Sequence, residues 1–253
     1  MYIDTHCHIS IDDYDDIEKV IEEDFKVVDK IIISGCSKEY IREAISIADT
    51  HDNIFVTIGY HPDQVDCCTN DDLKELEELL VHPKVVGVGE IGLDYHYEKD
   101  KKEAQIKLFE KQLEIAERFK LPVVIHSREA TEDTINTLKK FNVHGIIHAF
   151  SGSYETGLEY IKMGFLLGIG GVVTFTNSNL GDVVGKLGVD HLVLETDSPY
   201  LIPHPFRGKG MKNSSKYIPF IAKKVSEVTN VPLEDVGNIT SENAISLFDL
   251  RTK

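Results

Sequence analysis

Short apolar runs rich in β-branched residues alternate with amphipathic stretches along the whole chain. Each run has the length of one strand, and the stretches between them carry apolar residues at three- and four-residue spacing, which predicts helices. In the clearest stretch, residues 100–120, Ile106, Phe109, Leu113 and Ala116 would form an apolar stripe on a charged helix. Strands separated by helices predict βαβ units and a parallel sheet. The eight runs are Tyr2–His8, Lys30–Cys36, Ile54–Tyr60, Val85–Ile91, Pro122–His126, Gly145–Phe150, Phe165–Gly170 and His191–Asp197.

Eight strands with eight crossovers in 253 residues is the count of a closed (β/α)8 TIM barrel. An open, doubly wound sheet is the alternative. No linker, low-complexity segment or change of composition divides the chain, so we expect one domain over residues 1–253. Beyond the last crossover the tail predicts extra C-terminal helices, with Pro232 in a first turn and Thr240 or Ser241 as a cap. Ser37 and Asn70 are expected to cap earlier helices.

Composition and charge narrow the classes of function. The chain is 42% hydrophobic and 28% charged, as globular proteins are, and it has no apolar run long enough to span a membrane. Its start resembles no secretory signal. The four cysteines form no Cys-x-x-Cys pair, which predicts reduced thiols in a cytoplasmic protein. The formal net charge of −16 excludes polyanion binding through the overall field, so a nucleic-acid substrate would need bound cations and local Arg and Lys residues.

Polar residues gather where the predicted strands end, which in such a barrel is the active-site face. His6 and His8 are two apart on the first strand and would share a face, with Cys7 pointing away from them. By the same period of two, the polar residues expected to point inward at the strand ends are His6, His8, His61, Glu90, His126, His148, Glu195 and Asp197.

A metal centre explains this convergence. A single inward histidine is more often a hydrogen-bonded core residue, and a single inward glutamate can pair with an arginine. Several imidazoles and carboxylates in register on five strands would compete for space and protons without a cation. Imidazole is the commonest protein metal ligand, so the sequence predicts a metal site at the mouth of the barrel.

The ordered motifs along the chain resemble those of the TatD family of metal-dependent hydrolases. The resemblance covers essentially the whole chain and includes Arg207-Gly208-Lys209 and Ser241-Glu242-Asn243-Ala244. One departure stands at Asn213-Ser214-Ser215, where the family tends toward Asn-x-Pro. The principal motifs are Asp4-Thr5-His6-Cys7-His8, Gly59-Tyr60-His61-Pro62, Gly89-Glu90-Ile91-Gly92-Leu93-Asp94-Tyr95, Leu121 to Arg128, His148-Ala149-Phe150-Ser151-Gly152 and Glu195 to Leu201.

The family resembles the wider amidohydrolase barrels and is associated with metal-dependent DNase activity. The resemblance implies two divalent metal ions, with His6 and His8 on the first, His126 and His148 on the second, and Glu90 bridging both. Asp197 would complete the first ion and contact the attacking water, a role that makes Asp197 and Glu90 the expected catalytic residues. Asp4 and Glu195 are expected behind the ligands. Zn²⁺, Mn²⁺, Co²⁺ or Fe²⁺ would suit these ligands, and Mg²⁺ less well.

The expected reaction is hydrolysis of a DNA phosphodiester by a metal-bridging water, on single strands or strand ends. His61, Arg128, Arg207 and Lys209 would contact the substrate. In one alternative the same metal site hydrolyses a different bond, the ester of an aminoacyl-tRNA or a small ester or amide. Another is a metal-stabilised binding module without turnover. We expect neither a membrane nor an obligate protein partner.

Overall fold

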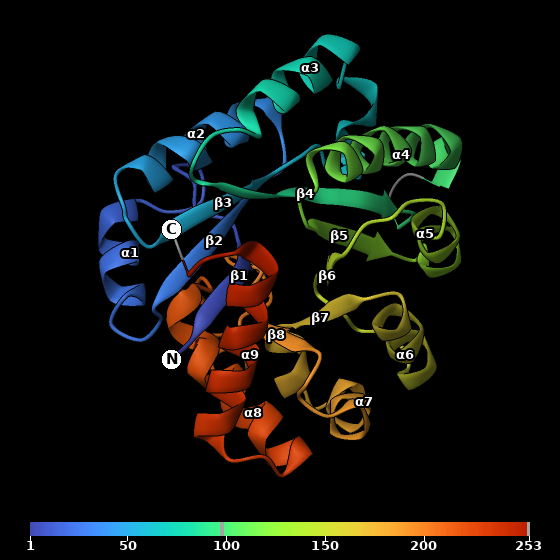
Figure 1. Ribbon diagram of the computed structural model, residues 1–253. Coiled ribbons are helices and arrows are strands. Elements are labelled where there is room, and N and C mark those ends of the chain that lie inside the picture. The colour runs from blue at the N-terminus through green and yellow to red at the C-terminus, as the bar shows by residue number, and fades with distance from the viewer. Residues whose placement is uncertain (97–98, 252–253) are drawn as a thin grey trace. The chain divides into compact units, whose positions relative to one another are not determined.

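The protein folds as a (β/α)8 barrel with C-terminal helices, as the sequence predicted. The computed structural model describes residues 1–96 and 99–251, and its elements are labelled in Figure 1. The strands follow one another in the sheet in chain order and are β1 (Ile3–Cys7), β2 (Lys30–Gly35), β3 (Ile54–Ile58), β4 (Val85–Asp94), β5 (Val123–Arg128), β6 (Gly145–Ile147), β7 (Phe165–Ile169) and β8 (Leu192–Leu194).

Helices connect the strands and end the chain. The α-helices are α1 (Ile17–Asp24), α2 (Lys38–Asp49), α3 (Asn70–Leu79), α4 (Lys102–Phe119), α5 (Thr131–Leu138), α6 (Tyr154–Lys162), α7 (Leu180–Leu187), α8 (Ile218–Thr229) and α9 (Leu233–Phe248). Short 3-10 helices are η1 (Pro62–Asp66), η2 (Lys99–Lys101), η3 (Gly171–Thr174) and η4 (Ser215–Tyr217). In the described part of the chain, no helix is both long and apolar enough to cross a membrane.

The chain forms two compact units. Unit 1 consists of Met1–Ile33 and His148–Lys253, and unit 2 consists of Ser34–Ile147. The strand pairs within each unit are parallel. Each unit is described by itself below.

In unit 2, β4 and β5 approach each other closely because a glycine lies between two acidic residues of β4. Gly92 pairs with His126, and two residues later Asp94 pairs with Arg128. Gly92 has φ +147°, and a Cβ there would lie 2.0 Å from the carbonyl oxygen of His126. Only glycine tolerates this conformation and this approach. Glu90, Gly92 and Asp94 alternate along one side of β4, which brings His126 between the two carboxylates.

Helix α4 fixes the ends of β3 and β4 with two buried glutamines. Gln105 accepts from the N–H of Asp94 at 2.9 Å and donates to its C=O at 2.9 Å. Gln112 accepts from the N–H of Tyr60 at 2.7 Å and donates to its C=O at 2.9 Å. The predicted apolar stripe of this helix is confirmed at Phe109, Leu113 and Ala116, which are fully buried, while Ile106 is half-buried. One helix face therefore packs the core and holds two strand ends.

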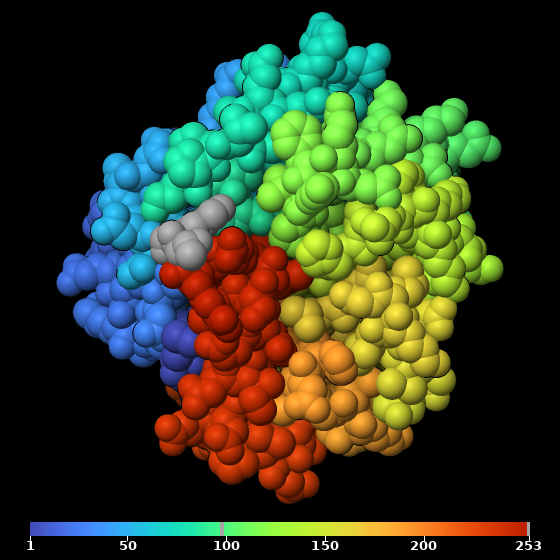
Figure 2. Space-filling model, in the orientation of Figure 1, coloured from blue at the N-terminus to red at the C-terminus, as the bar shows by residue number. Residues whose placement is uncertain are grey.

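In unit 1, α9 packs against β1 and β8. Asn243 of α9 donates to the C=O of Leu192 at 2.8 Å, and Ser241 donates to the C=O of Met1 at 3.2 Å. Figure 1 shows α8 and α9 side by side, and Figure 2 shows their residues (red) exposed along one face of this unit. The predicted cap at Thr240 or Ser241 is wrong. The Thr240 hydroxyl donates to the C=O of Val236 inside the helix at 2.8 Å, so α9 continues through it.

The predicted helix caps of unit 2 are partly confirmed. Ser37 caps α2 by accepting from the N–H of Tyr40 at 3.3 Å. The cap of α3 is Thr69 and not Asn70. Thr69 and Asp72 bond to each other's backbone N–H in a capping box, which satisfies two helix N–H groups at once. The helix cap therefore lies one residue before the predicted position.

Candidate metal centre

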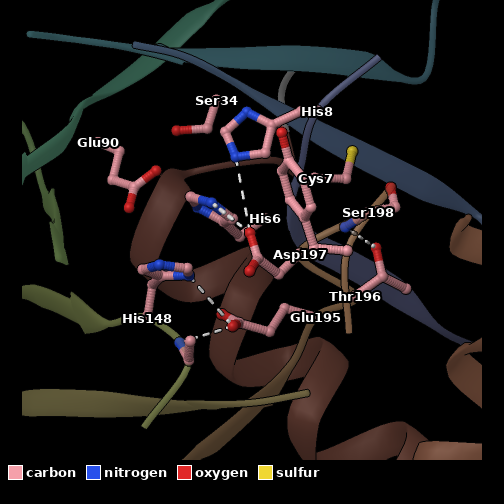
Figure 3. A network of polar contacts seen from close by, with 12 residues as sticks. His6, Cys7, His8, Ser34, Glu90, His148, Glu195, Thr196, Asp197 and Ser198 are labelled. Atoms are coloured by element: carbon pink, nitrogen blue, oxygen red, sulfur yellow. Dashed lines mark hydrogen bonds and ion pairs between the residues drawn. The ribbon is translucent and has the colours of Figure 1, made fainter. Parts of the chain in front are cut away.

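The first group of candidate ligands lies in unit 1. Ligand atoms of His6, His148 and Asp197 all lie within 4.8 Å of one another. The rings of His6 and His148 are stacked, with centroids 3.9 Å apart. One oxygen of Asp197 lies 3.6 Å from Nε2 of His6 and 3.6 Å from Nε2 of His8, as Figure 3 shows. Cys7 lies between the two histidines in sequence and points away from them, its thiol directed at the C=O of Ile32.

Asp197 reaches this group because the chain leaves β8 before it. The strand ends at Leu194, and Asp197 has φ +52°. The predicted inward–outward alternation of strand side chains therefore stops before Asp197. Buried Asp4 of β1 sets the path of the chain by accepting from the N–H of Thr196 at 3.0 Å and from its hydroxyl at 2.6 Å. The N–H of Asp197 then donates to the C=O of His6 at 3.0 Å. Asp4 thus acts on backbone rather than on the imidazole rings.

Asp4 and Asp197 have opposite pKa shifts. Burial raises the pKa of Asp4 to about 7, against hydrogen bonds from Thr196, Ser215 and the N–H of His6 that lower it. Burial also acts to raise the pKa of Asp197, but the neighbouring His8, His148 and His6 lower it below its ordinary value. Asp197 is therefore ionised at neutral pH, the form that binds a cation or accepts a proton.

Glu195 lies behind His148. It is fully buried. Its Oε1 accepts from the N–H of Ala149 at 2.6 Å and lies 3.3 Å from Nδ1 of His148. The space for this carboxylate exists because residue 168 is glycine, where a Cβ would lie 2.1 Å from Glu195 Oε2. A carboxylate on Nδ1 directs the other ring nitrogen, Nε2, away from Glu195.

The second group of candidate ligands lies in unit 2. Ligand atoms of His61, Glu90 and His126 lie within 4.8 Å of one another. Oε1 of Glu90 is 2.6 Å from Nδ1 of His126 and 3.9 Å from Nε2 of His61. The two imidazole rings lie edge to face, with centroids 4.5 Å apart. Glu90 is buried, and both histidines are largely buried.

Sequence reasoning gave no role to two acidic residues that contact this group. Oδ2 of Asp94 lies 3.2 Å from Nε2 of His126, and Oδ1 of Asp63 lies 3.0 Å from Nδ1 of His61. Burial acts to raise the pKa of Asp94, but its bonds from His126 and from the N–H of His96 lower it below the ordinary value. The spacing Glu90-x-Gly92-x-Asp94 was the available signal, since it puts both carboxylates on one side of β4.

Apart from the largely buried His61, the predicted substrate contacts are exposed cations. Arg128 ends β5 in unit 2, and its charge is among the causes that lower the pKa of Asp94. Arg207 and Lys209 lie in unit 1, where the Arg207 guanidinium carbon is 4.2 Å from the centre of the Phe175 ring. The Lys209 ammonium lies 5.9 Å from the Phe206 ring. Stacking of this kind holds a cation in place while leaving its donors available.

Asn213, Ser214 and Ser215, which depart from the family's pattern, anchor the end of the loop that carries Arg207 and Lys209. The fully buried Asn213 amide donates to the C=O of Thr196 at 2.9 Å and to the C=O of Tyr200 at 2.6 Å. Ser215 donates to Asp4 at 2.7 Å, and Ser214 donates to Asp24 at 2.7 Å. The loop thus has a fixed base without the family's proline.

Both groups suit divalent cations. Imidazole nitrogens with carboxylate oxygens are the donor set of Zn²⁺, Mn²⁺, Co²⁺ and Fe²⁺ sites, and each group holds three such donors close together. All six predicted ligands fall in one group or contact it. That His126 shares an ion with His148, and that Glu90 bridges two ions, stay predictions.

Comparison with known proteins identifies the family. A sequence model of the family described as TatD related DNase matches residues 3–249. The chain belongs to the TatD family. It is 41% identical to the metal-dependent hydrolase YabD of Bacillus subtilis, over 98% of this chain and 99% of that one. A 29% identical relative is the metal-dependent hydrolase TatD of Mycobacterium tuberculosis, with 98% of both chains covered.

Solved structures agree with this assignment. The crystal structure of YjjV, a TatD homologue from Escherichia coli K12, matches with a TM-score of 0.91 at 28% identity and covers 98% of both chains. An organophosphorus hydrolase from Deinococcus radiodurans matches with a TM-score of 0.58 at 12% identity, which shows a shared fold alone. This TatD-family chain is therefore a metal-dependent hydrolase.

Proposed function

We propose that this protein is a two-metal phosphodiesterase that hydrolyses DNA, acting on single strands or strand ends. The observation that carries the proposal is the pair of ligand groups, His6 with His148 and Asp197 in unit 1 and His61 with Glu90 and His126 in unit 2. In the proposal these donors hold two cations, with Glu90 bridging both. The family description, a DNase, supports DNA as the substrate class.

The reaction needs an activated water and a stabilised phosphate. Bound divalent cations supply a lowered pKa for the water and charge compensation for the phosphoryl oxygens. Asp197 accepts the water's proton, since its lowered pKa keeps it ionised and its carboxylate lies 3.6 Å from Nε2 of both His6 and His8. Glu90 orients the unit 2 histidines from its buried position. The two carboxylates thus have separate tasks, proton acceptance and ligand placement.

The distribution of charge supports a nucleic-acid substrate. No Asp or Glu stands between Asp197 and Glu227, in a chain whose net charge is −16. That acid-free segment carries six cations, namely Arg207, Lys209, Lys212, Lys216, Lys223 and Lys224. Arg207 and Lys209 contact phosphates in our proposal, together with Arg128 of unit 2. Aromatic rings beside these cations, Phe175 and Phe206, offer stacking surfaces for unpaired bases.

Hydrolysis of defined oligonucleotides tests the proposal. With Mn²⁺ or Mg²⁺ added, the purified protein should degrade labelled single-stranded DNA faster than duplex DNA, and chelation of the metal should stop the reaction. Asp197→Asn should reduce kcat at least about 100-fold, because loss of a positioned proton acceptor costs at least that much. Glu90→Ala should reduce kcat at least as strongly, because it removes a ligand of the cations that activate the water.

Matched controls are Asp190→Asn and Glu114→Ala, whose side chains are exposed and lie outside both ligand groups; both should retain the wild-type rate. An undiminished rate in Asp197→Asn would contradict the assignment of the proton acceptor. Turnover of an aminoacyl-tRNA ester, with no cleavage of any oligonucleotide, would replace phosphodiester hydrolysis by the alternative reaction.

A further inference from the structure

We infer that Tyr200 is a specificity-determining residue, whose exposed ring stacks on the nucleobase next to the cleaved bond and thereby selects unpaired strands. The inference deepens the proposed function and rests on it. It adds a base contact in unit 1 to the phosphate contacts proposed at Arg207 and Lys209.

The Tyr200 ring lies beside a candidate metal ligand. Its centroid is 6.4 Å from the centroid of the His8 ring, and the two ring planes meet at 66°. At this angle the rings are not stacked, so His8 does not take the place of a base. Nε2 of His8 in turn lies 3.6 Å from the carboxylate of Asp197, the proposed proton acceptor. A base that stacks on Tyr200 is therefore next to the residues that act on the reacting phosphate in the proposed function.

Tyr200 is exposed although it carries a large aromatic ring. Its exposed fraction is 59%, whereas the neighbouring His8 side chain is only 12% exposed. Covering apolar surface of this kind is favourable by about 25 cal/mol per Å². The ring therefore keeps this free energy available for a ligand, and a nucleobase offers a flat face of matching shape.

The backbone holds Tyr200 in place on both sides. Its N–H donates to the C=O of Asp197 at 2.9 Å, and its C=O accepts from the Asn213 amide at 2.6 Å. The next residue, Leu201, has φ +53°, a left-handed conformation that bulky residues seldom adopt. Because a tyrosine side chain has only two rotatable angles, a ring on such a fixed backbone loses little entropy on binding.

The charges of the same loop favour a nucleotide over an uncharged apolar ligand. Arg207 and Lys209 follow Tyr200 in a segment without acidic residues. Rings that stack on bases, next to cations that contact the phosphate backbone, are the means by which proteins bind single strands. In a duplex each base is already stacked on its neighbours in the strand. Only an unpaired or terminal base can therefore present a face to Tyr200.

The loops that follow the ligands His8 and Asp197 both expose large apolar side chains. Ile11 is 75% exposed in the loop after β1, and Met211 is 46% exposed in the loop after β8. The two loops are joined, because the Lys212 ammonium donates to the C=O of Asp13. Exposed apolar residues gathered around a site of polar ligands are typical of a binding surface, which agrees with a base held at Tyr200.

Kinetics on base-bearing and abasic strands test the inference. The substrates are a short oligodeoxyadenylate and a strand of the same length made of tetrahydrofuran abasic units, each with Mn²⁺. Tyr200→Ala should lower kcat/KM for the oligodeoxyadenylate about 5- to 150-fold, the effect of losing one base stack. The loss should appear mainly in KM, because the contact is made by bound substrate and transition state alike. On the abasic strand Tyr200→Ala should equal the wild type.

Two further substitutions separate stacking from other roles of the side chain. Tyr200→Phe keeps the ring and should behave as the wild type, whereas Tyr200→Leu keeps apolar bulk without a flat ring and should behave as Tyr200→Ala. Wild-type kinetics in Tyr200→Leu would overturn the inference, as would an equal loss on both strands in Tyr200→Ala. The control Phe141→Ala removes a half-buried ring that precedes β6 and lies outside both ligand groups, and it should change neither rate.

Equilibrium binding separates failure of this inference from failure of the proposed function. Fluorescence anisotropy of the labelled oligodeoxyadenylate should show weaker binding to Tyr200→Ala by the same factor as the kinetics. If the wild type cleaves DNA while Tyr200→Ala binds and cleaves it equally well, the proposed function stands and the inference fails. If the wild type binds the strand without cleaving it and Tyr200→Ala loses that binding, the base contact stands and the proposed reaction fails. A wild type that binds neither strand overturns both.

Discussion

At the scale of single residues, Asp24 is a buried carboxyl group outside both ligand groups. Its Oδ1 accepts from the Ser214 hydroxyl at 2.7 Å and from the N–H of Lys216 at 2.9 Å. Its Oδ2 accepts no hydrogen bond from the described residues. Burial raises the pKa of Asp24 to about 6, against these hydrogen bonds. The folded protein therefore favours the protonated acid.

This shift predicts a pH-dependent stability. Because folding raises the pKa of Asp24, the folded state binds the proton more tightly than the unfolded state, and this group's contribution to the free energy of unfolding rises as pH falls from 7 toward 4. The full effect is about 3 kcal/mol for a shift of roughly two units. Asp24→Asn should therefore be more stable than wild type at pH 8 and lose that advantage at pH 4.5.

Urea unfolding at pH 8, 6 and 4.5 measures this difference, with the exposed Asp190→Asn as the control for general charge effects. A stability difference between Asp24→Asn and wild type that is constant over the three pH values would refute the assigned cause.

Single residues also show where sequence reasoning stops. Periodicity identified His6, Glu90 and His126 as residues of metal-ligand type, because type and strand position were enough. It could not find Asp63 or Asp94 as partners of histidines. The period of two puts Asp94 on the same side of β4 as Glu90, but the contacts with the histidines also depend on how closely β4 and β5 approach and on the turn after β3, which no local pattern contains.

At the scale of elements, the strands were predicted in number and order, and their ends were predicted less well. The runs Gly145–Phe150 and His191–Asp197 were expected as strands, yet β6 ends at Ile147 and β8 at Leu194. Ala149 and Asp197 have φ of +45° and +52°. Long-range hydrogen bonds to Asp4 and Glu195 maintain these turns, and such contacts leave no local pattern in the sequence.

The base of the loop after β8 gives a prediction at the same scale. Asn213→Ala removes the donors to the C=O groups of Thr196 and Tyr200. Leaving buried acceptors unpaired costs about 1–3 kcal/mol, so the free energy of unfolding should fall by that amount. Trypsin should also cut faster after Arg207 and Lys209, while metal content stays at the wild-type value.

Asn177→Ala, at an exposed asparagine, is the control and should change none of these measurements. Wild-type trypsin sensitivity in Asn213→Ala would show that the loop is held by something other than this amide.

At the scale of the whole molecule, the barrel was predictable because every strand and helix carried its own pattern and the count of eight admits few folds. The single domain expected from the sequence stays a prediction, since the chain forms two compact units. The eight strands form one sheet, so we expect cooperative unfolding. Differential scanning calorimetry should give one transition whose calorimetric and van't Hoff enthalpies agree.

Two separate transitions, or release of a stable fragment near residues 34–147 by limited proteolysis, would contradict that expectation.

The metal-loaded protein should unfold at a higher temperature than the chelated protein, because an ion that binds only the folded state stabilises it by mass action.

The two hydrogen bonds of the Asn213 amide, to the C=O groups of Thr196 and Tyr200, have a consequence for how the sequence of this enzyme can evolve. One amide joins the two ends of the loop, so the stretch from Leu201 to Lys212 can be lengthened, shortened or exchanged while Asp197 keeps its path. The proposed substrate contacts Arg207 and Lys209 and the candidate metal ligands therefore lie in separable parts of the chain. Relatives with new substrates could arise by exchange of this stretch alone, and the same junctions are the natural points for grafting a loop in the laboratory.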